Sequence, residues 1–374
     1  MKKQILLTPG PTPLPAEVRE ALARPIIHHR TTVYQEIFKE VVEGLKEVFQ
    51  TRNDLFIFTS SGTGAMEAAI VNFLSPQDKV VVVVSGKFGE RFGEICNAYG
   101  LNTLLLPVTW GEACPPEALS EVLKKEKDVK AVYATLCETS TGVCHDIEPL
   151  TRVAHDHGAV LAVAAIIGLA AEPLLTDTWG VDIVVAGSQK ALMLPPGLSF
   201  ISVNARAWDL AKTARLPKFY FDLLKAKKAW QKFDSPFTPA IPLVVALRET
   251  LKRIHKKGME RIWKECAQMA QSTRKSVTRL GLSLFAKAPS NALTAVVVPQ
   301  GIDGKQLVRT LREKYGIWIA EGQGELAGKI FRIAHMGYIQ KKDIQLCMTA
   351  LEKELKGTHS GQHEDKEYRE AFSQ

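Results

Sequence analysis

Residues 183–190 read Ile-Val-Val-Ala-Gly-Ser-Gln-Lys, and the interpretation of the whole chain starts from them. The first four are apolar and mostly β-branched, which is typical of a short strand buried on both faces. The strand leads through Gly-Ser-Gln to Lys190, and an apolar tetrapeptide follows the lysine. Burial disfavours the charged form of a lysine and makes its amine available as a nucleophile. The ordinary alternative is a surface lysine in a polar turn, so the rest of the chain must decide between the two.

The composition is that of an ordinary globular protein. The 374 residues are 46% hydrophobic and 24% charged, with a net charge of +8, which suits one large or two medium domains. The basic residues are spread out and form no nucleic-acid recognition module, so we interpret them mostly as a solvated surface and expect no nucleic-acid partner. The first residues hold too short an apolar run for a signal peptide, and no stretch approaches the roughly 20 apolar residues of a membrane span. We therefore expect a cytoplasmic protein with no membrane partner.

The six cysteines show no C-x-x-C pair and no regular spacing; they stand at positions 96, 114, 137, 144, 266 and 347. The neighbours Cys144 and His145 could supply two metal ligands, but no second pair stands at ligand spacing. The sequence therefore predicts no metal site. Free thiols in a reducing cytoplasm are the expected state.

A second informative stretch joins an apolar strand, Leu55–Phe58, to a helix through the sequence Thr-Ser-Ser-Gly-Thr-Gly at 59–64. Glycine permits close approach of a ligand, hydroxyls donate hydrogen bonds, and the free amides of a helix start attract an anion. The same residues could instead do no more than cap the helix. A G-x-G-x-x-G dinucleotide fingerprint is absent from this loop.

Between residues 80 and 190, apolar strands alternate with helical segments. We expect strands at 80–84, 103–106, 131–135, 160–164 and 183–186, and helices at 88–99, 116–125 and 147–157. This alternation predicts an α/β fold with a mostly parallel sheet covered by helices on both faces. Ligands of such sheets bind beyond the carboxyl ends of the strands. The residues expected to gather there are Ser61 to Thr63, Phe88, Thr139, Ala164 and Lys190.

The C-terminal part predicts a second, smaller α+β domain. A proline-rich loop at 235–240 and a long helical region at 243–280 lead to strands at 294–298, 317–320 and 330–334 and to helices at 304–315 and 341–355. We expect an N-terminal arm at 1–20, a large domain at 21–245, a small domain at 246–356 and a polar, disordered tail at 357–374.

Five short motifs occur in a fixed order along the chain: Thr8-Pro9-Gly10-Pro11, residues 60–67 (SSGTGAME), residues 138–142 (ETSTG), residues 187–197 (GSQKALMLPPG) and Phe331-Arg332-Ile333. In this order they resemble the class-V aminotransferases, enzymes of fold type I that use pyridoxal 5'-phosphate (PLP). The similarity is strongest to the alanine–glyoxylate and serine–pyruvate aminotransferase group. It covers the chain from Leu7 to about Leu355, and it implies PLP as the cofactor and a homodimer with shared active sites.

The resemblance also implies roles for individual residues. Lys190 would be the Schiff-base lysine and would move the proton during catalysis. Phe88 would stack on the pyridine ring, and Thr139 would hydrogen-bond near the ring hydroxyl. Gly10 and Arg332 would bind the substrate, because a planar guanidinium suits a carboxylate. The phosphate would be held by Ser61, Gly62, Thr63 and Gln189, with Thr238 reaching the phosphate of the neighbouring subunit.

Ala164 departs from the family pattern. In the family this strand ends in an aspartate that pairs with the pyridine nitrogen and keeps the ring protonated, so that the ring withdraws electrons. Neither Glu138, on the neighbouring connection, nor Asp182, at the wrong end of its strand, is an obvious replacement. Losing such a charge-assisted partner should cost roughly a thousandfold in rate.

Several functions therefore stay open from the sequence. The leading hypothesis is an aminotransferase for small amino acids and 2-oxo acids of the alanine/serine–glyoxylate or pyruvate type, with weakened or atypical chemistry. The alternatives are a non-catalytic binding protein or complex subunit on the same scaffold, and a PLP lyase. An engineered substitution at Ala164 is a further explanation that the sequence leaves open.

Overall fold

A seven-stranded sheet lies at the centre of the fold, with strand order β2-β10-β9-β8-β5-β3-β4. Its strands are Asp54–Phe58 (β2), Lys79–Val84 (β3), Asn102–Pro107 (β4), Val129–Thr135 (β5), Val160–Ala164 (β8), Ile183–Gly187 (β9) and Ser199–Val203 (β10). The five strands from β9 to β4 are parallel, and β10 runs antiparallel to both of its neighbours. The predicted mostly parallel sheet is confirmed, but β10 was not predicted. The computed structural model describes residues 4–358, so most of the predicted tail lies outside the described residues.

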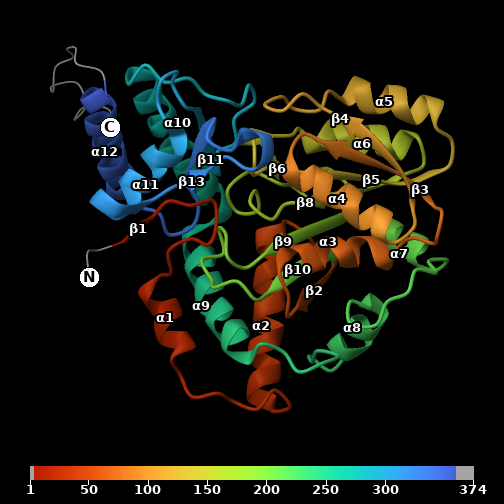
Figure 1. Cartoon of the computed structure of the whole chain (residues 1–374). Coiled ribbons are helices and arrows are strands. Elements are labelled where there is room, and N and C mark those ends of the chain that lie inside the picture. Colours follow the sequence, from red (N-terminus) through yellow and green to blue (C-terminus); the bar gives the residue numbers. More distant parts are fainter. Residues whose placement is uncertain (1–3, 359–374) are drawn as a thin grey trace.

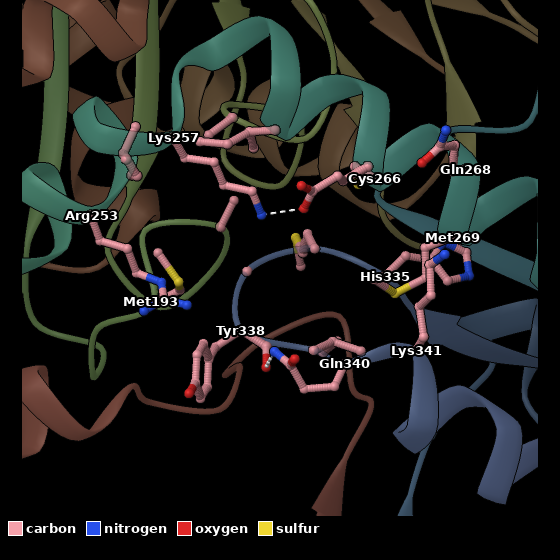
Figure 2. A pocket seen from close by; sticks show the side chains of 18 residues that line it. Met193, Arg253, Lys257, Cys266, Gln268, Met269, His335, Tyr338, Gln340 and Lys341 are labelled. Carbon is pink, nitrogen blue, oxygen red and sulfur yellow. Dashed lines mark hydrogen bonds and ion pairs between the residues drawn. The ribbon is translucent and has the colours of Figure 1, made fainter.

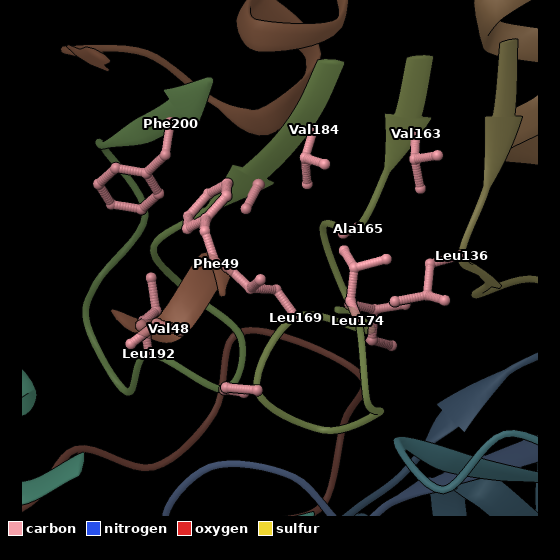
Figure 3. Close-up of a cluster of buried hydrophobic side chains, with 14 of the residues drawn as sticks. Val48, Phe49, Leu136, Val163, Ala165, Leu169, Leu174, Val184, Leu192 and Phe200 are labelled. Atoms are coloured by element: carbon pink, nitrogen blue, oxygen red, sulfur yellow. The ribbon is translucent and has the colours of Figure 1, made fainter. Parts of the chain in front are cut away.

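Helices cover both faces of this sheet (Figure 1). One face packs against α3 (Gly62–Val71), α4 (Lys87–Ala98), α7 (Ala205–Ala211) and α8 (Leu223–Trp230). The other face packs against α2 (Thr32–Phe49), α5 (Pro116–Lys125), α6 (Ile147–Asp156) and α9 (Ile241–Lys257), and α1 (Ala16–Leu22) lies against α9. Because successive strand side chains point to opposite faces, β8 contributes Ala162 and Ala164 to the α3/α4 core and Val163 to the other core. Figure 3 shows Val163, Val184 and Phe200 in this second core, with Phe49 of α2 beside them.

A smaller antiparallel sheet, in the order β11-β14-β13, forms a separate core in the C-terminal part. Its strands are Leu293–Val297 (β11), Ala320–Glu321 (β13) and Ile330–Ala334 (β14), with a 3₁₀ turn at Gly324–Leu326. The helices of this part are α10 (Met259–Arg279), α11 (Gly304–Tyr315) and α12 (Lys341–Thr358). The predicted boundary at 245/246 falls inside α9, and the division into two domains stays a proposal.

The helical region predicted at 243–280 consists of two helices, because Gly258 has a positive φ of 80° and separates α9 from α10. The strand expected at 317–320 is also divided. Its first half, β12 (Ile317–Trp318), pairs in parallel with β1 (Ile5–Leu6) of the N-terminal arm, and its second half is β13. The arm is therefore held by the C-terminal part of the chain.

A short hairpin, β6 (Cys137–Glu138) with β7 (Val143–Cys144), follows β5 and carries the predicted site residue Thr139 at its turn. Within residues 4–358, no helix combines the length and apolar character needed to cross a membrane. The fold thus places Lys190, the hairpin turn and the start of α3 together at the carboxyl end of the parallel strands.

Candidate active site

Lys190 lies directly after β9 and is held against the N-terminal arm. Its Nζ donates a hydrogen bond to the Pro9 carbonyl at 2.6 Å, and its own carbonyl accepts one from Thr12 Oγ1 at 2.7 Å. Gly10 has a φ of +110°, and a Cβ there would lie 2.4 Å from both Cδ and Nζ of Lys190. Glycine at position 10 is therefore a steric requirement for this position of the lysine.

The Lys190 amine is largely buried and surrounded by positive charge. Burial, followed by the charges of Arg332 and Arg91, lowers the pKa of Lys190 from 10.5 to about 8. Both effects disfavour the ammonium form, and a nucleophilic or proton-accepting lysine needs this shift. The structure therefore supports the reactive interpretation of Lys190 over that of a solvated surface lysine.

The start of α3 offers an anion site next to β9. Ser61 is the N-cap residue, yet its side chain accepts no hydrogen bond from the first backbone amides of α3. These amides therefore have no side-chain cap and can donate to a bound anion. A Cβ on Gly187 would lie 3.7 Å from the N and Cα of Gly62, which shows how closely β9 approaches the helix start. Within residues 4–358, the buried Oε1 of Gln189 has no hydrogen-bond partner. The free amides of a helix start are donors that a phosphate would engage, whereas the Gln189 oxygen is an acceptor, so Gln189 would have to present its Nε2 to a phosphate.

Arg91 belongs to the same site and was missed in the sequence. Its Nη1 donates to Thr63 Oγ1 at 3.4 Å, and its guanidinium lies 4.8 Å from the centre of the Phe88 ring. The signal that could have found it is its position three residues after Phe88, since side chains at i and i+3 share a helix face. With Lys190 and Arg332, it makes the site strongly electropositive.

Glu138 fixes the start of α4 and thereby the position of Phe88. Its completely buried carboxylate accepts hydrogen bonds from the backbone amides of Phe88 and Gly89, each at 3.1 Å, and from Ser140 Oγ at 2.6 Å. Burial raises the pKa of Glu138, and these hydrogen bonds oppose the rise. Because the carboxylate is used in this way, Glu138 does not replace the missing aspartate.

Arg332 reaches the site from β14 and is almost completely buried. Its Nη1 donates to the Thr139 carbonyl at 2.8 Å and to Gln323 Oε1 at 3.3 Å. Its Nε and Nη2 both donate to the Glu321 carbonyl. Burial lowers the pKa of Arg332 to about 10, so the guanidinium stays charged. A substrate carboxylate could form two parallel hydrogen bonds only by displacing Gln323 or the Glu321 carbonyl, and this role stays a prediction.

Ala164 ends β8 in apolar surroundings. It is 4% exposed and belongs to the core between the sheet and α3/α4, on the side of the sheet where Phe88 lies. The neighbouring Ile166 points at the helix start, because its Cδ1 would lie 2.7 Å from a Cβ on Gly62. Asp182 is at the other end of the sheet, as predicted, where it accepts a hydrogen bond from the backbone amide of Leu161, near the start of β8, at 2.7 Å. Neither Asp182 nor Glu138 is therefore placed to substitute for an aspartate at position 164.

Thr238 is the predicted site residue that this chain does not bring to Lys190. It is exposed in the loop between α8 and α9. The adjacent Phe237 stacks on Tyr220 with ring centres 5.2 Å apart, and Phe219 nearby is 72% exposed. A role for Thr238 at the phosphate of a second subunit therefore stays a prediction.

A cavity of about 370 Å³ lies next to the Lys190 turn but is separate from the site (Figure 2). Ala191 and Met193 form part of its wall, together with α9, α10 and the segment 335–341. The dashed line in Figure 2 marks the ion pair of Lys257 with Glu265. Neither Lys190 nor any other predicted site residue lines this cavity. We therefore treat the cavity as separate from the candidate active site around Lys190.

The fold and the site together define an α/β protein with a reactive lysine beside an anion site at the carboxyl ends of its strands. The profile of the family Aminotransferase class-V matches residues 6–345. The chain therefore belongs to the class-V aminotransferases, PLP-dependent enzymes of fold type I, and the resemblance drawn from the five motifs is confirmed.

The relatives cover nearly the whole chain. The soluble hydrogenase small subunit of Synechococcus sp. (strain PCC 6716) is 42% identical over 94% of this chain and 93% of its own length. The L-aspartate–glyoxylate aminotransferase of Paracoccus denitrificans (strain Pd 1222) is 36% identical over 89% and 86%. The crystal structure of alanine–glyoxylate aminotransferase from Nostoc sp. superposes with a TM-score of 0.91 at 30% identity, covering 94% of this chain and 95% of that one.

Proposed function

We propose that this chain is a PLP-dependent aminotransferase that moves amino groups between small amino acids and 2-oxo acids, with Lys190 as the residue that holds the cofactor covalently. The observation that carries the proposal is the lysine amine of lowered pKa at the end of β9, beside the uncapped start of α3. Relatives named as serine–glyoxylate and alanine–glyoxylate aminotransferases support glyoxylate as the acceptor and alanine or serine as the donor.

The residues fit PLP in most respects. The phosphate would be held by the amides of Ser61, Gly62 and Thr63 and by the Nε2 of Gln189, which can donate a hydrogen bond. Phe88 would lie against the pyridine ring and Thr139 near its hydroxyl. When bound, PLP supplies an aldehyde carbon that takes up the amino group and a ring that delocalises electrons.

The chain's own residues would then do three things. The Lys190 amine, whose pKa is lowered to about 8, can take and return a proton near neutral pH, and the Pro9 carbonyl orients it. Arg332 would bind the substrate carboxylate, which would replace Gln323 Oε1 as the acceptor of a hydrogen bond from Arg332 Nη1. Gly10 leaves the space that the lysine and the substrate share.

We further propose that the active protein is a homodimer with shared sites. Thr238 and the aromatic side chains of Phe219 and Tyr220 lie at one exposed surface, which supports this arrangement. Thr238 would contact the phosphate held by the second subunit. A partly exposed aromatic cluster is also a typical component of a protein interface.

The test is a half-reaction in which the protein carrying PLP is mixed with one amino acid at a time and its absorbance near the visible edge is followed. L-alanine or L-serine should convert the cofactor and release the 2-oxo acid, slowly because of Ala164. Arg332→Lys should raise the donor concentration needed while leaving the cofactor absorbance in place. If the protein binds PLP but no donor changes its spectrum, the aminotransferase proposal fails.

Ala164 also favours a second candidate, a PLP-fold binding protein or complex subunit with little turnover. Its apolar surroundings offer nothing that would hold a proton on the pyridine nitrogen. The Synechococcus relative is named as a small subunit, which is compatible with this candidate. Binding of PLP without any half-reaction, together with co-purification of a partner, would favour it.

A further inference from the structure

Cys137 and Cys144 are directly opposite each other in the hairpin of β6 and β7. Their Sγ atoms and a carboxylate oxygen of Glu172 all lie within 4.8 Å of one another. Glu172 comes from the segment after β8, far along the chain from either cysteine, and for this reason sequence spacing did not reveal the group. His145, the neighbour that suggested a ligand pair in the sequence, is not part of it.

The group is enclosed, and a hydroxyl oxygen beside it is a fourth possible ligand atom. Cys137 is 3% exposed and Glu172 6%, whereas Cys144 is partly exposed and leaves a way in from the surface. Ser290, in the loop before β11, is completely buried, and its Oγ lies 3.1 Å from Cys137 Sγ and 2.8 Å from Glu172 Oε1. Two sulfurs, a carboxylate and a hydroxyl thus meet at one point.

Glu172 retains the capacity to bind one more group. Its Oε1 accepts from Ser290 Oγ and from the Asn291 amide, and its Oε2 accepts from Asn291 Nδ2 at 3.0 Å. Each carboxylate oxygen has two lone pairs, so Oε2 keeps one lone pair that no hydrogen bond within residues 4–358 uses. Arg274 donates to the Ser290 carbonyl and to Asn291 Oδ1, and it places a positive charge beside the group.

The group is distinct from the candidate active site. Successive residues of a strand point to opposite faces, so Cys137 faces away from the side on which its neighbour Glu138 caps α4. The hairpin turn between them carries Thr139, whose carbonyl accepts from Arg332. The cysteines therefore lie behind the hairpin whose front helps to form the active site.

We propose that Cys137, Cys144 and Glu172 bind a zinc ion, with the Ser290 hydroxyl or a water as the fourth ligand. Zinc prefers four ligands, with thiolate sulfurs at about 2.3 Å, which places two sulfurs roughly 3.8 Å apart in a tetrahedral site. The two sulfurs and the carboxylate oxygen lie within 4.8 Å of one another, so they would have to move inward by at most about 1 Å to bind zinc. Binding releases the two thiol protons and changes no oxidation state. Two thiolates and one carboxylate around Zn²⁺ leave one negative charge, which Arg274 offsets.

The site would join three separate segments: the β6–β7 hairpin, the segment after β8 and the loop before β11. The first two belong to the part of the chain around the central sheet, and the third leads into the small sheet. Zinc would therefore stabilise the contact between these two parts, and we assign it a structural role. Catalysis at Lys190 does not depend on it.

The test is a Co²⁺ titration of the full-length protein after treatment with a chelator and a thiol reductant, read as a difference spectrum. We expect one Co²⁺ per chain with a thiolate charge-transfer band, displaced by Zn²⁺, and a rise in Tm on adding Zn²⁺. Cys144→Ser and Cys137→Ser should each weaken binding at least a hundredfold, and Glu172→Gln about tenfold. Cys114→Ser, at a buried cysteine outside the group, is the matched control and should bind like the unaltered protein.

Cys144→Ser is the variant that tells a loss of metal binding from misfolding, because the Cys144 side chain is only partly buried. This variant should keep the far-UV spectrum of the unaltered protein. The proposal is overturned if Co²⁺ gives no thiolate band, or if Cys144→Ser and Cys114→Ser bind equally well. It is also overturned if the protein purified without reductant contains a Cys137–Cys144 disulfide that forms in preference to metal binding.

Discussion

Replacing Ala164 with aspartate should lower the stability of the cofactor-free protein and raise its catalytic rate. Ala164 is 4% exposed and lies in the apolar core between the sheet and α3/α4. An aspartate there would gain no hydrogen-bond donor from the apolar side chains of this core in the cofactor-free protein. With PLP bound, the new carboxylate would meet the pyridine nitrogen.

The magnitudes follow from these surroundings. Burying a polar group without a hydrogen bond costs about 1–3 kcal/mol in proteins, so Ala164→Asp should lose about that much unfolding free energy without PLP. A charge-assisted hydrogen bond to the bound cofactor should recover about 1.5–3 kcal/mol. Stabilising the electron-accepting ring by about 3–4 kcal/mol in the transition state corresponds to a rate increase of roughly two to three orders of magnitude.

The assay combines urea unfolding with and without PLP and single-turnover rates with L-alanine or L-serine. Ala164→Asn is the matched control, since it has nearly the same shape but carries no charge, and its rate should rise far less. The reasoning is refuted if Ala164→Asp binds PLP and reacts no faster than the unaltered protein. An equal loss of stability with and without PLP would also refute it.

Four further results are expected. Between about pH 8 and pH 10.5 the native protein binds fewer protons at Lys190 than the unfolded chain does, so the unfolding free energy of the cofactor-free protein should rise with pH across this window. Lys190→Met should remove this rise and should increase the unfolding free energy at pH 7 by up to about 3 kcal/mol, as measured by urea unfolding. Gly10→Ala should weaken PLP binding at least tenfold in a spectroscopic titration, whereas Gly301→Ala, at a positive φ with open space around it, should not. Burial lowers the pKa of His335 to about 3, so the unfolding free energy should fall as the pH drops from about 6.5. His335→Gln should reduce the dependence of the unfolding free energy on pH by about 1.4 kcal/mol per pH unit, as measured by denaturation at pH 4.5 to 6.5. An unchanged pH dependence would contradict this prediction. Glu138→Gln should destabilise the protein by about 1–3 kcal/mol, seen as a lower urea midpoint, because the start of α4 loses a charged acceptor.

The features that the sequence predicted correctly are those encoded locally. The apolar run before Lys190 and the Ser-Gly stretch before α3 each determine a strand or a helix start within a few residues. The order of strands and helices from 80 to 190 follows from the same local periodicity. The placement of Lys190 beside the start of α3 then follows from the rule that parallel strands end at one edge of a sheet.

The features that the sequence did not predict depend on contacts between distant residues. β10 is a strand because it pairs with β2 and β9, and β12 is separated from β13 because the N-terminal arm pairs with it. The partners of Arg332 are backbone carbonyls, which leave no pattern in a sequence. The meeting of Glu172 with Cys137 likewise needs the fold.

The most direct test of the central claim, that Lys190 holds the cofactor, is to locate the cofactor on the chain. The protein is incubated with PLP, treated with borohydride to fix the cofactor to the amine that holds it, digested and mapped by mass spectrometry. The account predicts one labelled peptide, with the label on Lys190, and no label in Lys190→Ala. A label on another lysine, or PLP bound without any lysine label, would contradict it.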